Sequence, residues 1–79
     1  MGIYVQIQRT SSNGKISKYM FSNGIGKGEF SVNESSGKID YYEKMPNDSK
    51  NLHFSRAAYK VIKYWQETGT LPEKETWAS

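Results

Sequence analysis

We predict an α+β fold, in which an antiparallel meander of three or four strands is followed by one amphipathic helix packed on one sheet face. The first 45 residues contain short segments of alternating polarity separated by Gly- and Asn-containing turns, which is typical of antiparallel strands. Residues 51–68 alone sustain a helical periodicity. The connections are short, so strands that are neighbours in sequence are expected to be neighbours in space.

The first two strands are expected on either side of a tight turn. Residues 3–8 alternate apolar and polar side chains, the pattern of a half-buried strand. Asn13-Gly14 is a strong hairpin signal. A second strand runs from about residue 15 to residue 21, with Ile16 and Met20 on one face and Tyr19 and Phe21 on the other. Both faces carry apolar residues, so the face that meets the core stays open.

Two further strands are expected before the helix. Residues 29–33 place Phe30 and Val32 on one face, and residues 34–37 turn the chain. A fourth strand is expected over residues 38–45, where Ile39 and Tyr41 share one side. Pro46 ends this strand because it has no backbone N–H to continue the ladder.

The helix over residues 51–68 is the element around which the fold is organised. Polar residues at 47–49 and 51 provide candidate N-caps, and Gly69 and Pro72 provide the stop. Its apolar face recurs at helical spacing and is expected to pack on the sheet. The predicted core comprises Phe54, Ala57, Ala58, Val61, Ile62, Tyr64 and Trp65 of the helix with Ile3, Val5, Ile7, Ile16, Phe30, Val32 and Ile39 of the strands.

The chain is predicted to be a single domain over residues 1–79, divided into a sheet (1–45), a helix (51–68) and a C-terminal tail (69–79). Trp77 stands out in the tail because a large ring so near a terminus either docks on the domain or belongs to an interface. We expect it to dock beside the helix end.

Composition narrows the functional classes. The chain has no Cys, which excludes disulfides and thiolate metal sites, and it has one His. No apolar run approaches the roughly 20 residues of a membrane span, and the N-terminus lacks the pattern of a signal peptide. We therefore expect a cytoplasmic protein with no membrane partner. The net charge of +3 is mild and its signs are interspersed, which is typical of a soluble surface.

No catalytic motif is recognised. His53 has serines and Asp48 nearby, but nothing resembles a nucleophile elbow, and one His cannot serve as both acid and base without a second group. The glycines of residues 22–28 match neither a dinucleotide fingerprint nor a Walker loop. We expect a protein that is not an enzyme and uses no cofactor or metal.

The basic face of the helix is the best candidate for a functional surface. Arg56, Lys60 and Lys63 recur at helical spacing with Tyr59 beside them, forming a stripe about 10 Å long at 1.5 Å per residue. Aromatic residues make up 14% of the chain, more than one small core can hide. Some are therefore expected on the surface, where aromatics form binding sites.

From residue 29 onward the chain resembles small bacterial toxin-immunity proteins. The segment GEFSVNESSGKIDYYEKMP is followed by FSRAAYKVIKYWQETGTLPEKETWAS, and this order resembles the short inhibitors of contact-dependent or colicin-like toxins. The resemblance implies a non-enzymatic cytosolic protein that binds one toxin domain and blocks its active site or substrate surface. Since this chain is mildly basic, the resemblance implies a toxin with an acidic face.

Two functional hypotheses follow, and a third concerns self-association through exposed aromatics. The first is a protein-binding module, most concretely an immunity protein that neutralises a cognate toxin. The alternative is a small nucleic-acid-binding protein that places Arg56, Lys60, Lys63 and Lys18 on phosphates and stacks tyrosines on bases. Whether the helix face or a sheet face binds, and the oligomeric state, stay open. The predicted partner contacts are Tyr19, Tyr42, Arg56, Tyr59, Lys60, Lys63 and Trp77.

Overall fold

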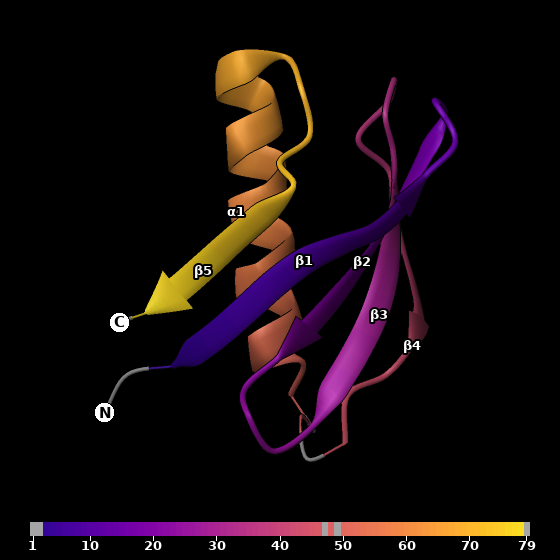
Figure 1. The fold of residues 1–79 in the computed structure, drawn as a ribbon. Helices are drawn as coiled ribbons and strands as arrows, with labels where there is room; N and C mark the ends of the chain where they lie inside the picture. The colour runs from indigo at the N-terminus through magenta and orange to yellow at the C-terminus, as the bar shows by residue number, and fades with distance from the viewer. Residues whose placement is uncertain (1–2, 47, 49, 79) are drawn as a thin grey trace.

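Five antiparallel strands form one sheet, and a single helix covers one of its faces (Figure 1). The computed structural model describes residues 3–46, 48 and 50–78. The predicted α+β class and the packing of the helix on one sheet face are both confirmed. The elements in chain order are β1 (Tyr4–Ser12), β2 (Ile16–Ser22), β3 (Lys27–Asn33), β4 (Ile39–Glu43), α1 (Leu52–Thr68) and β5 (Lys74–Ala78).

The sheet has one more strand than the sequence predicted. Its order is β4-β3-β2-β1-β5, so the first four strands form the expected meander and β5 returns to pair with β1. Trp77 lies opposite Val5 and Glu75 lies opposite Ile7 in this added pair. The C-terminal segment is thus partly a strand rather than only a tail, and β1 becomes an interior strand.

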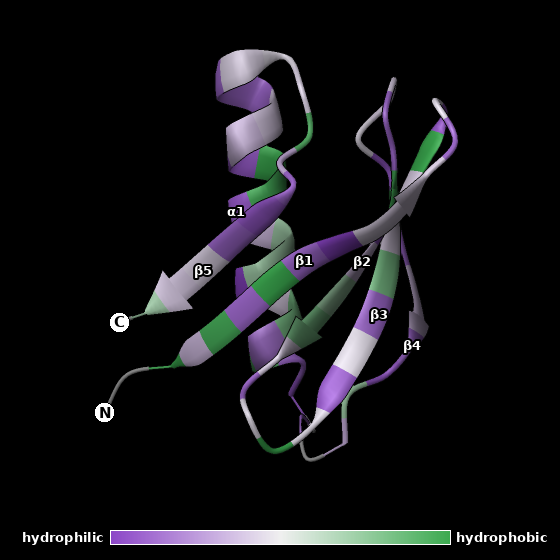
Figure 2. Ribbon diagram, viewed as in Figure 1, coloured by the Kyte–Doolittle hydropathy of each residue, from purple (hydrophilic) through white to green (hydrophobic). Residues whose placement is uncertain are grey.

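Hydrophobic and hydrophilic residues alternate along β1, as Figure 2 shows. Buried and exposed residues alternate in the same strand, so the two sets lie on opposite faces of the sheet. On the face toward α1, Ile7 lies opposite Phe21 and Tyr19 lies opposite Phe30. The helix packs against β5, β1 and β2. The buried apolar core consists of Val5, Ile7, Tyr19, Phe21, Phe30, Val32, Met45, Ala57 and Val61.

Three expected positions are corrected by this register. The helix-facing side of β2 carries Ser17, Tyr19 and Phe21, which are all fully buried, so Ile16 lies on the opposite face and is outside the core. Tyr19, expected at a partner surface, is a core residue. Tyr64, expected in the core, is 38% exposed and lies in the second half of α1, beside Lys60 and Glu75.

The start of α1 is capped by a residue that lies before the helix. The carboxylate of Asp48 accepts the backbone N–H groups of His53 and Phe54, at 3.1 Å each, and the ring Nδ1 of His53 lies 3.2 Å away. Burial alone would raise the pKa of Asp48, but these N–H donors outweigh it and hold that pKa below its ordinary value. Asn51 makes no side-chain cap, and the candidate caps at 47 and 49 lie outside the described residues.

The helix ends where the sequence predicts. Gly69 adopts a left-handed conformation with φ of 79°, and its N–H donates to the carbonyl of Trp65. Trp65 in turn packs on the β3–β4 turn, where a β-carbon at Gly37 would lie only 2.9 Å from the indole ring. The far end of the helix is therefore fixed to the hairpin next to it.

Candidate protein-binding surface

Five of the seven predicted contact residues come together where α1 lies beside β5. We call this set the helix–β5 cluster; it consists of Arg56, Tyr59, Lys60 and Lys63 of the helix and Trp77 of the strand. The pairing of β5 with β1 brings Trp77 next to the basic face of α1. The sequence grouped the four helix residues by their spacing, and the fifth strand adds Trp77 to the same surface.

Trp77 docks on the domain, but against Arg56 and Tyr59 in the first half of α1 rather than beside the helix end. The guanidinium carbon of Arg56 lies 5.2 Å from the Trp77 ring centroid, within the range of a cation–π contact. The ring of Tyr59 meets Trp77 edge-on, with centroids 5.8 Å apart and planes at 84°. The indole Nε1 of Trp77 is buried with no hydrogen-bond partner. The ring is therefore held by packing alone.

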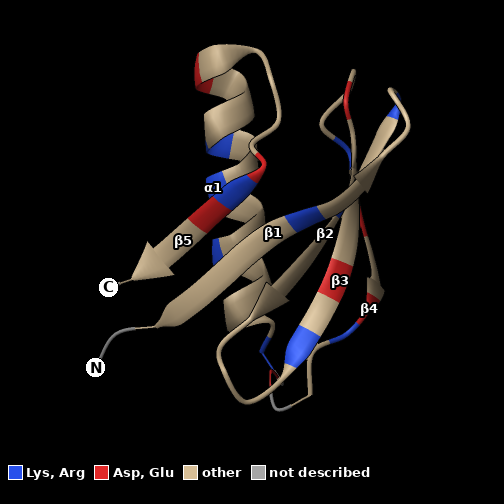
Figure 3. Cartoon of the chain, viewed as in Figure 1, with Lys and Arg blue, Asp and Glu red and all other residues tan. Residues whose placement is uncertain are grey.

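The charges of the cluster are partly balanced within it. Lys60 Nζ lies 3.9 Å from a carboxylate oxygen of Glu75 on β5, and Lys63 Nζ lies 5.8 Å from the ring centroid of Tyr59. Glu67 lines the same hollow as Lys60, Lys63 and Glu75. Figure 3 shows cationic positions along α1 with one acidic position near its C-terminal end, whereas acidic and cationic positions alternate along β5. Three cations thus face two carboxylates, which leaves a small positive excess.

The outer part of the cluster is open to a partner. The side of Tyr59 away from Trp77 is accessible, since this residue is 52% exposed, and Lys63 is also exposed. Beside them a groove runs along α1, with the half-buried Ala58 and Ile62 among its lining residues, and Ile62 also packs against the core. The accessible surface therefore combines a tyrosine anchor, an apolar strip and cations, a composition that suits protein recognition.

The remaining two predicted residues lie elsewhere. Tyr19 is buried under α1, and its hydroxyl donates to the carbonyl of Pro72. Tyr42 lies on the sheet face opposite the helix, where its hydroxyl donates to Glu29 at 3.0 Å and Lys18 Nζ lies 6.0 Å from its ring. Desolvation, followed by the bond to Glu29 and nearby carboxylates, raises the pKa of Tyr42 to about 12.

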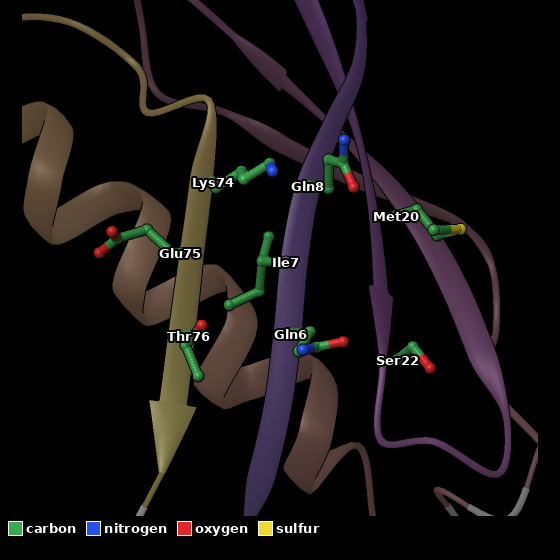
Figure 4. A pocket seen from close by; sticks show the side chains of 8 residues that line it. All are labelled: Gln6, Ile7, Gln8, Met20, Ser22, Lys74, Glu75 and Thr76. Carbon is green, nitrogen blue, oxygen red and sulfur yellow. The ribbon is translucent and has the colours of Figure 1, made fainter.

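Sequence reasoning missed a shallow pocket on the same open sheet face. It has a volume of about 180 Å³ and spans β5, β1 and β2. Figure 4 shows Lys74 extending from β5 toward β1. No sequence signal indicated it, because the pocket exists only once β5 has paired with β1. Its polar side chains are Gln6, Gln8, Ser22, Lys74 and Thr76, with Met20 beside them.

Other chemistry has little support among the residues that the structure describes. Within them, no group of three or more His, Cys, Asp or Glu side chains is placed to hold a metal ion. No helix in the same residues is long and apolar enough to cross a membrane. His53 contacts Asp48 through Nδ1, and its Nε2 lies 3.4 Å from the side-chain amide of Asn23. This arrangement fixes the start of α1 to the β2–β3 turn.

Comparisons with protein-family models, with curated proteins and with solved structures find no match to this chain. The functional conclusion therefore depends on the geometry of the helix–β5 cluster and on the chemistry of its side chains.

Proposed function

We propose that this chain is a non-enzymatic protein-binding module, most concretely an immunity protein that binds and neutralises a cognate bacterial toxin through its helix–β5 cluster. The observation that carries the proposal is the gathering of an Arg, a Tyr, two Lys and a Trp on one surface. Binding hot spots are enriched in Trp, Tyr and Arg and are supported by well-packed neighbours. Here Trp77 positions Arg56 and Tyr59 through packing.

The chemistry of the cluster also defines the partner. Tyr59 and the strip formed by Ala58 and Ile62 would meet an apolar depression. Lys63 and Arg56 would meet carboxylates around that depression, because charges at the edge of an interface steer association and fix orientation. A toxin domain with an acidic rim around its active site or substrate cleft has these properties.

The nucleic-acid alternative is less well supported by the same geometry. Lys60 is directed to Glu75, and Glu67 adjoins Lys63, so few of the cations are available for phosphate. Strong binding to a polyanion requires several uncompensated cations. Titration of a labelled single-stranded oligonucleotide at low ionic strength tests this alternative, and saturable binding that weakens steeply with salt would favour it over the protein-binding proposal.

The proposal is tested by expressing this chain together with the products of its neighbouring genes. We expect one product to arrest growth, and this chain to restore growth and to co-purify with that product. Tyr59→Ala should abolish both effects, whereas Tyr4→Ala serves as the matched control, because Tyr4 is also exposed, at 47%, but lies outside the cluster. Equal loss in both variants, or no toxic neighbour, would contradict the proposal.

A further inference from the structure

The end of the molecule at the start of α1 has two exposed apolar side chains and exposed lysines on the chain segments that meet there. Ile25, in the β2–β3 turn, is 85% exposed, and Leu52, the first residue of α1, is 44% exposed. Lys27, Lys44 and Lys50 are exposed on the segments that meet there. We call these five residues the lysine tip. Figure 1 shows the β2–β3 turn, the end of β4 and the start of α1 together at this end.

The turn that presents Ile25 is held in one conformation by its own hydrogen bonds. The side-chain oxygen of Asn23 accepts the backbone N–H groups of Ile25 and Gly26, at 2.9 and 3.0 Å. The side-chain amide of Asn23 then faces Nε2 of His53 on α1. Gly26 lies against Pro46, so that a β-carbon there would be 3.4 Å from the Pro46 carbonyl oxygen. Ile25 is therefore directed into solvent from a supported turn, which lowers the ordering cost of contact.

The charge at the tip is positive. The Asp48 carboxylate is nearly inaccessible, with a side-chain exposure of 2%, and is occupied by N–H donors from the helix. Glu43, at the end of β4, is the nearby carboxylate that remains exposed. Figure 3 shows cationic positions at the start of β3 and on the chain between β4 and α1. Three exposed lysines thus lie on the same end of the molecule as Ile25 and Leu52, against one exposed carboxylate.

From these features we propose that the lysine tip adsorbs to the surface of an anionic lipid bilayer, with Ile25 inserted at the headgroup level and the three lysines on lipid phosphate and carboxylate groups. Protein hot spots are enriched in Trp, Tyr and Arg, and the tip has none of these residues. The tip instead combines protruding aliphatic side chains with lysines, which is the composition of interfacial membrane contacts. Adsorption of this kind needs no membrane-spanning helix and does not depend on the function proposed above.

The proposal is tested by sedimenting the full chain with vesicles of phosphatidylcholine containing 30% phosphatidylserine, and with vesicles of phosphatidylcholine alone. We expect binding only to the anionic vesicles, and release as salt is raised. Each lysine should contribute about fivefold to the partition coefficient. Replacing Lys27, Lys44 and Lys50 together by Gln should therefore lower it about 100-fold, and Ile25→Ser should lower it about tenfold, for partial burial of one aliphatic side chain.

A matched control separates the tip from the overall charge. Replacing Lys15, Lys38 and Lys74 by Gln removes the same charge from other parts of the surface, since the first two lie in the turns at the opposite end of the sheet. We expect the partition coefficient of this control variant on anionic vesicles to stay within about twofold of that of the original chain. This change is smaller than the effect of one lysine at the tip. Equal losses in the two triple variants would overturn the proposal, as would a lack of binding to anionic vesicles.

Insertion at Ile25 can be observed directly because the chain has no cysteine. An environment-sensitive dye on Ile25→Cys should shift to the blue on anionic vesicles, whereas the same dye on Ser36→Cys, in the β3–β4 turn, should not. Circular dichroism confirms that each variant is folded. A dye at position 25 that stays in water while the protein sediments would contradict the proposed orientation, and binding of an acidic protein without vesicle binding would assign the tip to that protein.

Discussion

Replacing Trp77 tests whether its ring is held on the domain by packing alone, beside the backbone pairing of β5 with β1. Trp77→Ala removes the contact with Arg56 at 5.2 Å and the edge contact with Tyr59 at 5.8 Å. Complete truncation of a core Trp costs about 3–5 kcal/mol. Trp77 is only partly buried, so we expect a loss of about 2–3 kcal/mol in the free energy of unfolding. A chain of 79 residues has about 4–12 kcal/mol in total.

Trp77→Phe should behave differently. It keeps an aromatic ring against Tyr59 and Arg56 but removes the indole Nε1, which is buried without a partner. Relief of an unsatisfied buried donor is worth about 1–3 kcal/mol, which should offset most of the loss of ring volume. We therefore expect a net change of less than about 1 kcal/mol.

Urea unfolding followed by far-UV circular dichroism measures both variants without depending on tryptophan fluorescence. The slope of the transition follows the surface area exposed on unfolding. It should therefore be the same in both variants and the original chain if folding remains two-state. If Trp77→Phe were as costly as Trp77→Ala, Nε1 would be making a bond and the packing account would be refuted.

Three further predictions concern the scaffold. Asp48→Ala should lower stability by about 1–2 kcal/mol in urea unfolding at pH 7. Because the pKa of Asp48 is depressed in the folded state, its contribution to stability is present above the pKa of the unfolded chain. It is lost as the pH falls below about 4. Tyr19→Phe should weaken the loss of stability at high pH. Burial raises the pKa of Tyr19 to about 12 in the folded state, so its contribution to stability is complete below the pKa of the unfolded chain and is lost between about pH 10 and 12. Alkaline denaturation of the two proteins measures this difference. Gly37→Ala should cost about 1–2 kcal/mol more than Gly14→Ala in thermal unfolding, since both residues have positive φ but only Gly37 would meet Trp65; equal costs would contradict that contact.

The sequence predicted the elements whose signals are local. The helix is expected over residues 51–68 and lies at Leu52–Thr68, because its periodicity and Gly69 both mark it. The Asn13-Gly14 turn joins β1 and β2 as expected, with Gly14 at φ of 87°. The alternation along β1 predicts that Val5 and Ile7 face the core, and both are buried there.

What could not be predicted depends on long-range pairing. β5 is a five-residue strand, KETWA, with Trp77 as its one large apolar residue, and it is stabilised only once it pairs with β1 and packs on α1. The faces of β2 were ambiguous because both are apolar, and the pairing of Ile7 with Phe21 decides them. Tyr19, which was expected on the surface, therefore lies in the core. Helix spacing alone groups four residues of the helix–β5 cluster. The fifth, Trp77, joins them only because β5 pairs with β1 beside α1.

The most direct measurement of the central claim is a calorimetric titration of this chain with the purified product of whichever neighbouring gene arrests growth. The protein-binding account predicts a one-to-one complex whose Kd rises at least about 30-fold in Tyr59→Ala, the equivalent of 2 kcal/mol for a hot-spot residue, and changes little in Tyr4→Ala. No complex, or one that Tyr59→Ala leaves unchanged, would contradict the assignment of the helix–β5 cluster as the binding surface.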